Sequence, residues 1–173
     1  MNNACHIVKP LSTLAVKRAA LDYRDKNSDC INKYGVIDVL KVLEAKHKKY
    51  VIVPDEELLL ADAITKANGE ILIRESVYVQ AYYDDYRSRF TIAHELGHAV
   101  LHAPFDGFGQ GRDILAYKER YYDSEWQANT FAAELLIPTS TLIYLRTEGV
   151  SLDVISKKFM VSKQCLETKI NKI

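Results

Sequence analysis

The stretch Phe90-Thr91-Ile92-Ala93-His94-Glu95-Leu96-Gly97-His98 places two histidines four residues apart, with a glutamate directly after the first. Positions four apart lie on one face of a helix, about one turn from each other, so both imidazoles can reach one metal ion. Zinc held by two histidines and an acid lowers the pKa of a bound water to about 7, and an adjacent glutamate can accept its proton. The stretch therefore predicts a metal-binding helix and the chemistry of peptide-bond hydrolysis.

The residues around this motif predict a helix with two different faces. One face is apolar or small and consists of Ala93, Leu96, Gly97, Val100 and Leu101. The other face is polar and consists of Thr91, His94, Glu95, His98 and His102. Three histidines on one polar face favour metal ligands, although two hydrogen-bonded histidines on a partly exposed helix would give the same pattern. Gly97 lowers helix propensity by about 1 kcal/mol relative to Ala, so we expect another element to pack closely against it.

A third protein ligand is expected, because catalytic zinc sites usually have three and keep one position open. Residues 124–138 predict a second helix, with Ser124 as N-cap and Pro138 at its end. Glu125 and Asn129 lie four residues apart beside its apolar stripe, so Glu125 can be the third ligand while Asn129 supports a zinc-bound histidine from behind. The alternative for Glu125 is an ordinary acidic residue that stabilises the helix N-terminus.

These two stretches together carry a family resemblance. The motif at residues 90–98, followed by Glu125-x-x-Ala128-Asn129-x-Phe131-Ala132-Ala133-x-Leu135-Leu136-x-Pro138, resembles the ImmA/IrrE family of zinc metallopeptidases, with a weaker likeness from about Gly35 to the C-terminus. The resemblance implies a gluzincin-like zinc site, with His94, His98 and Glu125 as ligands and Glu95 as the base. It also implies the substrate, a helix-turn-helix repressor that is cleaved to release genes of a mobile element or a stress response.

Other candidates for the site are less specific. The oxyanion that forms during amide hydrolysis needs a hydrogen-bond donor, and Tyr122, Tyr121 and His102 are our candidates. His102 is better suited to line the cleft or to accept a hydrogen bond than to bind the metal, because it lies eight residues after His94. The three cysteines are too scattered for a zinc ribbon. Zinc is the expected metal, although ligand type alone leaves manganese and iron open.

The remaining sequence predicts an α+β fold, in which a small, largely antiparallel sheet packs with helices and precedes the zincin-like active-site helix. We expect helices at residues 11–23 and 36–47, strands at 50–54 and 76–83, and a hairpin around Asn68-Gly69. In gluzincin-like folds an edge strand of the sheet pairs with the extended substrate. The Gly-rich run at 104–111 is interpreted as a connector, with a mobile flap over the cleft as the alternative.

The C-terminal region predicts a pair of short helices. Residues 151–170 have the layout of a helix-turn-helix and are rich in lysine, but Gln164 is almost the only residue suited to reading base edges. We therefore do not expect direct binding to nucleic acid. The expected organisation is a zincin-like metallopeptidase domain at residues 1–148, including the N-terminal helix, with the helical segment 149–173 packed on the same domain.

Length and composition are those of a small globular enzyme. The chain has 173 residues, of which 48% are hydrophobic and 27% charged, and its formal net charge is +0. A neutral chain has no overall attraction to nucleic acid or to an acidic membrane. The start of the chain lacks the features of a signal peptide, and no segment has the roughly 20 apolar residues of a membrane span. An odd number of cysteines fits a reducing compartment, so we expect a cytoplasmic protein.

Two functional hypotheses follow from different classes of protein. The first is a zinc-dependent endopeptidase that cleaves a regulatory protein, in keeping with the resemblance. The second is a non-catalytic regulatory or toxin-antitoxin partner that retains the zincin fold with a structural metal. Glu95 favours the first hypothesis, because a structural zinc site needs no base beside its ligands. The sequence predicts neither the scissile bond nor the oligomeric state.

Overall fold

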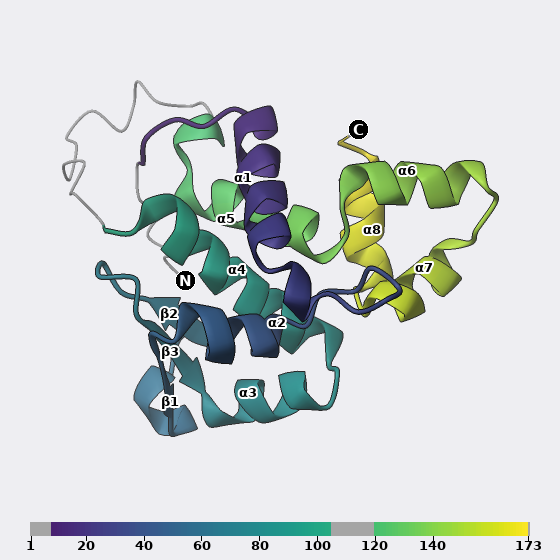
Figure 1. The fold of residues 1–173 in the computed structure, drawn as a ribbon. Coiled ribbons are helices and arrows are strands. Elements are labelled where there is room, and N and C mark those ends of the chain that lie inside the picture. Colours follow the sequence, from purple (N-terminus) through teal and green to yellow (C-terminus); the bar gives the residue numbers. More distant parts are fainter. Residues whose placement is uncertain (1–7, 105–119, 173) are drawn as a thin grey trace.

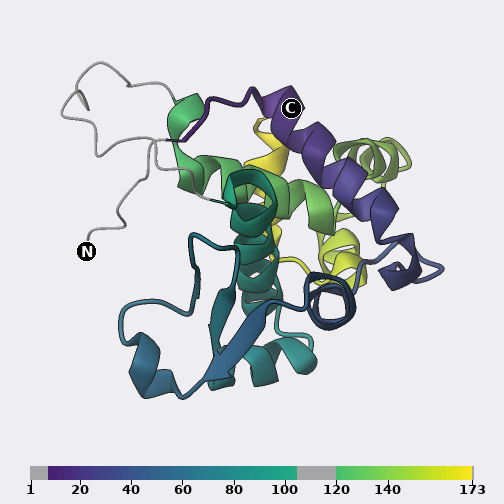
Figure 2. The ribbon, with the colours of Figure 1, turned by 60° about the vertical axis from the view of Figure 1, so that its left-hand side comes forward.

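Helix α4 (Tyr86–His102) carries the histidine motif and runs through the middle of the structure. The sheet lies on one side of it, and α1 (Thr13–Lys26) and α5 (Ser124–Leu136) lie on the other (Figures 1 and 2). Helix α4 begins after Asp85, whose side chain accepts a hydrogen bond from the Ser88 backbone N–H at 2.7 Å. The metal motif is thus carried by an element that is packed from both sides.

The computed structural model describes residues 8–104 and 120–172. Within these ranges the other helical segments are short, and several are single turns. They are η1 (Ser28–Cys30), α2 (Val39–Lys41), the π-helical η2 (Val42–His47), η3 (Asp55–Leu58), α3 (Glu75–Tyr82), η4 (Arg120–Tyr122), α6 (Thr139–Thr147), α7 (Leu152–Phe159) and α8 (Lys163–Ile170).

The described residues form a sheet of three strands, in the order β1-β3-β2. Strand β3 (Ile71–Arg74) lies in the middle, parallel to β1 (Tyr50–Val53) and antiparallel to β2 (Ala63–Thr65). The α+β class is therefore confirmed, but the sheet is mixed and not largely antiparallel. The predicted hairpin is present as β2 and β3, with Gly69 at φ 81 in its turn. The parallel pairing of β1 has no local signal, because the chain between β1 and β3 also forms β2.

Two predicted elements differ from the structure. Residues 76–83 were expected to form a strand because valine and tyrosine favour strands, but residues 75–82 form helix α3 and Tyr83 is its C-cap. Val77 and Ala81, four residues apart, are both buried, so the helical period of this segment decides its structure. Helix α2 begins only after Asp38, which caps it by accepting the Lys41 N–H at 3.0 Å. Ile37 instead forms an antiparallel bridge with Ile31, which keeps the start of the predicted helix extended.

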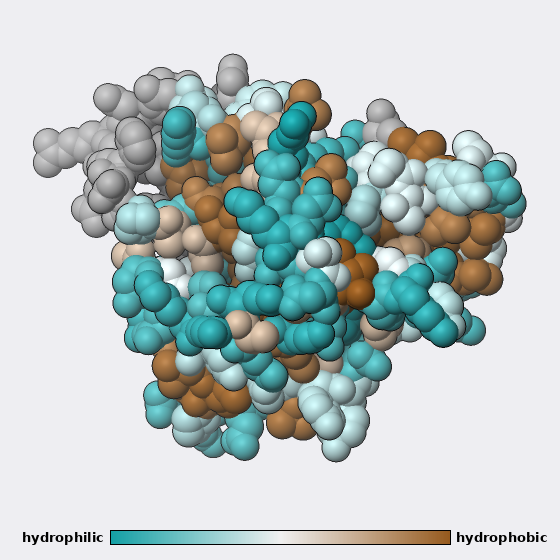
Figure 3. Space-filling model, viewed as in Figure 1, coloured by the Kyte–Doolittle hydropathy of each residue, from teal (hydrophilic) through white to brown (hydrophobic). Residues whose placement is uncertain are grey.

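The face shown in Figure 3 is mainly polar, with hydrophobic residues gathered over α6 and α7 and beside β1. Ile143 and Val154 on the two helices are exposed, as are Val51 and Ile52 on β1. Across residues 8–104 and 120–172, none of the helices combines the length and the hydrophobicity that a membrane span requires.

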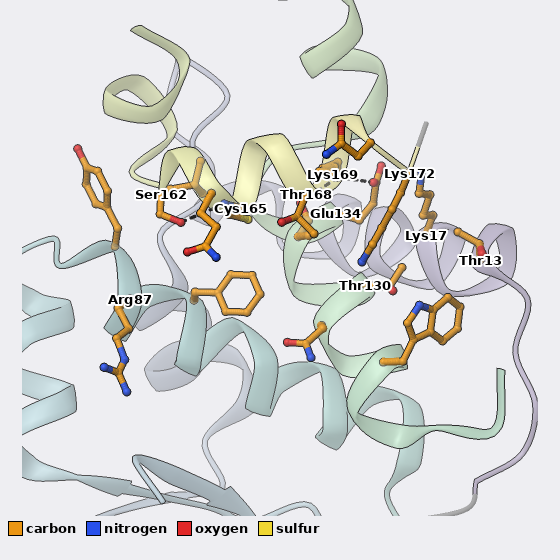
Figure 4. A pocket seen from close by; sticks show the side chains of 18 residues that line it. Thr13, Lys17, Arg87, Thr130, Glu134, Ser162, Cys165, Thr168, Lys169 and Lys172 are labelled. Atoms are coloured by element: carbon orange, nitrogen blue, oxygen red, sulfur yellow. Dashed lines mark hydrogen bonds and ion pairs between the residues drawn. The ribbon is translucent and has the colours of Figure 1, made fainter. Parts of the chain in front are cut away.

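A buried ion pair attaches the C-terminal helix α8 to α5. Lys169 and Glu134 are 6% and 2% exposed, and the Lys169 Nζ lies 2.6 Å from the Glu134 Oε2 (Figure 4). The same ammonium group donates to the carbonyl oxygens of Ala133 at 3.0 Å and Ile137 at 2.7 Å. Because all three partners are acceptors, the lysine satisfies a carboxylate and the last turn of α5 together. Phe159 of α7 and Leu166 of α8 belong to the same hydrophobic core as the buried residues of α5.

Replacing this lysine should strongly destabilise the fold. In Lys169→Ala the Glu134 carboxylate would stay buried without its counter-charge, which costs about 3–5 kcal/mol in comparable pairs. The matched control is Lys163→Ala on the same helix, because the pair of Lys163 with Asp153 is 56% and 60% exposed and such pairs contribute about 0–1 kcal/mol. Urea unfolding of both variants measures the difference. Equal free energies of unfolding for the two variants would contradict this account.

Candidate metal centre

Three side chains from α4 and α5 converge on one point. The Nε2 atoms of His94 and His98 are 3.0 Å apart. The Glu125 carboxylate faces both rings, with Oε2 at 3.3 Å from the His94 Nε2 and Oε1 at 3.2 Å from the His98 Nε2. Among the residues that the structure describes, these three form the group of side chains suited to hold a metal ion.

The geometry of this group fits a tetrahedral metal. Zinc–nitrogen and zinc–oxygen bonds of about 2.0–2.1 Å at tetrahedral angles put neighbouring ligand atoms about 3.3 Å apart. The three measured separations of 3.0 to 3.3 Å are close to this value. Two imidazoles and one carboxylate are also the donor set of a catalytic zinc site, which leaves a fourth position for water or substrate. The residues present therefore fit zinc.

The close approach of α4 and α5 makes this convergence possible. A Cβ at Gly97 would lie 3.1 Å from the Phe131 Cδ1 and 3.2 Å from the Ala128 carbonyl oxygen. The expected close contact at this glycine is therefore present, and its partner is α5. The N-cap of α5 is Asp123 and not Ser124, since the Asp123 carboxylate accepts the Glu125 N–H at 2.9 Å. Asp123 thus fixes the first turn of α5, from which Glu125 points toward the histidines.

The second ring nitrogen of each histidine also has a partner. The Nδ1 of His94 lies 3.0 Å from the Asn129 Oδ1, as the spacing of Glu125 and Asn129 predicts. The Nδ1 of His98 lies 3.1 Å from the Nδ1 of His102. On its other side, the His102 Nε2 lies 3.0 Å from the Gln127 Oε1. Both ring nitrogens of His102 are therefore engaged, so this ring has no N–H left for the oxyanion of a substrate.

Gln127 is a site residue that sequence reasoning missed. Its side chain is fully buried, and its Nε2 donates to the carbonyl oxygens of Lys9 at 2.9 Å and Tyr121 at 2.7 Å. The one signal in the sequence is that the amide side chain of Gln127 lies directly beside Ala128, at the apolar stripe of α5. Its partner in the N-terminal segment is 118 residues away in the sequence, and no local pattern indicates that contact.

The two tyrosines proposed as oxyanion donors lie beside the site and not among the described residues that line its cleft. The backbone carbonyl groups of Tyr121 and Tyr122 accept hydrogen bonds from Leu11 at 3.2 Å and Val8 at 3.0 Å. The Tyr121 ring packs edge-on against Trp126, with the ring centroids 5.5 Å apart. Their predicted role in catalysis gains no support from this placement. The Gly-rich run lies outside the described residues from position 105 onward.

The three candidate ligands border a cleft of about 610 Å³ between α4, α5 and β2. Residues 60–66, which include β2, form one wall of it. Glu95 lines the cleft and is only 7% exposed. Thr65 on β2 donates a hydrogen bond to the Glu95 Oε2 at 2.6 Å, and so holds the carboxylate in place. This threonine was also missed, because it lies 30 residues before its partner.

A second hollow of about 930 Å³ adjoins this cleft, because Phe90 and Asn129 line both. Cys165 and Thr168 of α8 and its N-cap Ser162 lie along one side of it, with Lys17 of α1 beyond (Figure 4). The C-terminal helix therefore shapes the surface beside the candidate metal centre.

Charges at the centre support one another. The hydrogen bond from His94 holds the pKa of the Glu125 carboxyl well below its usual range. Burial opposes a charge on His94, but the hydrogen bond with Glu125 and the nearby charge of Glu95 outweigh it and raise the pKa of His94. Burial lowers the pKa of His102, which keeps that ring neutral near pH 7. Without metal, His94 and Glu125 therefore form an ion pair in weakly acidic solution.

This pair should make the stability of the metal-free protein depend on pH. A histidine whose pKa is raised on folding stabilises the fold below its unfolded pKa of about 6.5, and this contribution is lost as the pH rises through the raised value. A carboxylate whose pKa is lowered contributes above its unfolded value of about 4.3 and loses that contribution in stronger acid. The combined contribution should be largest between these two values.

The test compares the free energy of unfolding of the chain with that of Glu125→Gln in the presence of a chelator, at about pH 5.5 and pH 8.5. We expect the stabilising effect of Glu125 to be larger at the lower pH. Subtracting the variant removes the contributions of the other titrating groups. A difference that does not change between the two pH values would contradict the ion pair.

A comparison with known protein families identifies the family of the chain. Residues 44–171 match the sequence model of peptidase family M78, which is described as the IrrE N-terminal-like domain. No curated protein and no solved structure matches the chain. The match covers both ligand-bearing helices and most of the sequence, so the resemblance to ImmA/IrrE proteins is confirmed. The chain therefore belongs to the IrrE N-terminal-like family, a family of the metallopeptidase type.

Proposed function

We propose that the protein is a zinc-dependent endopeptidase. The observation that carries the proposal is the convergence of His94, His98 and Glu125 in the same cleft as the buried carboxylate of Glu95. A structural metal site is closed by its ligands and needs no base beside it. Here the cleft remains open toward the point where the three ligand atoms meet.

The chemistry is divided between the metal and the side chains around it. Zinc in this site would supply a Lewis acid and a water of lowered pKa. Glu95 accepts the proton of the attacking water and passes it to the leaving amine. Thr65 keeps one carboxylate oxygen of Glu95 occupied by its hydrogen bond of 2.6 Å, so the other oxygen is left to face the water. Asn129 holds the His94 ring from behind.

Strand β2 is suited to bind an extended peptide. It is an edge strand of the sheet, paired on one side with β3, and residues 60–66 line the cleft. An extended substrate can add to such an edge through its backbone and present one amide to the metal centre. Leu60 at the rim of the cleft is 99% exposed and offers an apolar contact to a substrate side chain. Binding of this kind favours an unfolded or extended segment of a protein over a compact one.

The proposed substrate is a regulatory protein, specifically a helix-turn-helix repressor. This step rests on the family resemblance, since the cleft geometry by itself selects only an extended peptide. We further propose that the enzyme works in the cytoplasm, where such repressors bind DNA, and that it does not bind DNA itself. The burial of Lys169 in the ion pair with Glu134 removes one of the lysines that make the C-terminal segment basic.

Two substitutions in α4 test the proposal. In Glu95→Gln the metal ligands are intact but the base is lost, so we expect stoichiometric zinc and a loss of cleavage of about 10²–10⁴-fold. In His94→Ala we expect both zinc and cleavage to be lost. The measurement is mass spectrometry of fragments after co-expression with the transcription factor encoded beside this protein, with zinc content determined on the purified chain. Glu148→Gln, an exposed change at the end of α6, is the control.

The non-catalytic alternative predicts a different result. Zinc-loaded protein would then leave the repressor intact and instead form a stable complex with it in a pull-down. Full cleavage by Glu95→Gln would also contradict the assignment of the base.

A further inference from the structure

A line of hydrogen bonds runs from the proposed metal centre into the interior. It passes from His98 to His102, from His102 to Gln127, and from Gln127 to two backbone carbonyl groups, with distances of 3.1, 3.0, 2.9 and 2.7 Å. In both imidazole–imidazole and imidazole–amide contacts either partner can be the hydrogen-bond donor, depending on which atom carries the proton. The two backbone carbonyl groups at the inner end of this line determine which atom is the donor in every one of these hydrogen bonds.

The Gln127 side chain has only one orientation that satisfies its neighbours. Its partners at Lys9 and Tyr121 are carbonyl oxygens, which can only accept. The atom that faces them must be the amide nitrogen, which donates both of its protons. The atom that faces His102 is therefore the amide oxygen, and the His102 Nε2 must donate to it.

The same reasoning continues to the ligand. A neutral imidazole has one N–H, so His102, which donates from Nε2, has a bare Nδ1. That bare nitrogen lies 3.1 Å from the Nδ1 of His98, which must then carry the proton of this bond. Neutral His98 is left with a bare Nε2, and this is the atom that faces the His94 ring and Glu125. A metal at the centre can bind His98 only when this Nε2 carries no proton, so the tautomer with its proton on Nδ1 is the one required.

The two ligand histidines are supported in different ways. Behind the nitrogen that faces Glu125, the Nδ1 of His94 contacts the exposed Asn129. His98 is supported by a relay that ends on the main chain, with the fully buried Gln127 in its middle. One of the two terminal carbonyl groups belongs to Lys9, which precedes the matched family region at residues 44–171. The N-terminal segment therefore contributes to the surroundings of the centre from outside that region.

We propose that His102 and Gln127 are positioning residues, which hold His98 in the one tautomer that can bind a metal and are themselves oriented by the carbonyl groups of Lys9 and Tyr121. The inference rests on the proposed metal site, but not on the proposed peptidase activity. His102 then acts through His98 and does not touch the substrate, in place of the oxyanion role that the sequence suggested for it.

The first test compares two substitutions of His102 that replace the ring by side chains of nearly the same shape and size. In His102→Asn the amide oxygen lies where the ring Nδ1 was and can still accept the His98 proton, whereas His102→Leu has no acceptor. Zinc affinity is measured by competition with a chromophoric chelator. We expect His102→Leu to bind zinc about 10–100-fold more weakly, the usual effect of losing a partner behind a ligand, and His102→Asn to retain most of the affinity.

The second test asks whether Gln127 acts through His102. Gln127→Met should weaken zinc binding in the natural chain but have no further effect in a His102→Leu background, because the relay is already broken there. Asn129→Ala acts on the other ligand, so its effect should add to that of His102→Leu. Circular dichroism and thermal unfolding of the metal-free variants show whether each is folded, which matters because Gln127 also ties Lys9 to Tyr121.

Equal zinc affinities of His102→Leu and His102→Asn would overturn the proposal, as would full additivity of Gln127→Met with His102→Leu. The expected pattern in a protein that cleaves no repressor would uphold the relay and refute only the proposed activity. Failure of every chain, including the natural one, to bind zinc would refute both.

Discussion

The contact between α4 and α5 at Gly97 is the constraint on which the site depends. A Cβ at this position would lie 3.1 Å from the Phe131 ring and 3.2 Å from the Ala128 carbonyl oxygen, so any side chain there would force α5 or the ring to shift. At this separation Glu125, in the first turn of α5, faces two histidines that are one turn apart on α4. A glycine that is unfavourable for an isolated helix therefore brings together the candidate metal ligands of two helices. The helix propensity lost at this position is offset by the close approach of the two helices that glycine allows.

Hydrogen bonds fix the orientation of these side chains. His94 and His98 each direct one ring nitrogen toward the candidate metal centre and the other toward a partner, Asn129 or His102. Glu95 is held in the same manner by Thr65 from the sheet. The site is therefore assembled from three layers of the fold, the two helices and the edge strand, and each of them contributes a group that orients another. Such support restricts the rotation of the side chains before any metal or substrate arrives.

The sequence was informative where one helix carries the signal and uninformative where a contact joins distant segments. The spacing of four residues predicted that His94 and His98 share a face, and that Glu125 and Asn129 share another. The roles of Thr65 and Gln127 could not be predicted, because their hydrogen-bond partners lie 30 and 118 residues away in the sequence. Helix α3 was mistaken for a strand, since its valines and tyrosines favour strands while its packing on α4 requires the helical period.

X-ray absorption spectroscopy of the zinc-loaded protein tests the central claim most directly, because it reports the atoms bound to the metal. The account predicts one zinc per chain with nitrogen and oxygen ligands at about 2.0–2.1 Å, including the outer scattering of two imidazole rings. A sulfur ligand at about 2.3 Å, which would implicate a cysteine, or a zinc ion without imidazole ligands would contradict it.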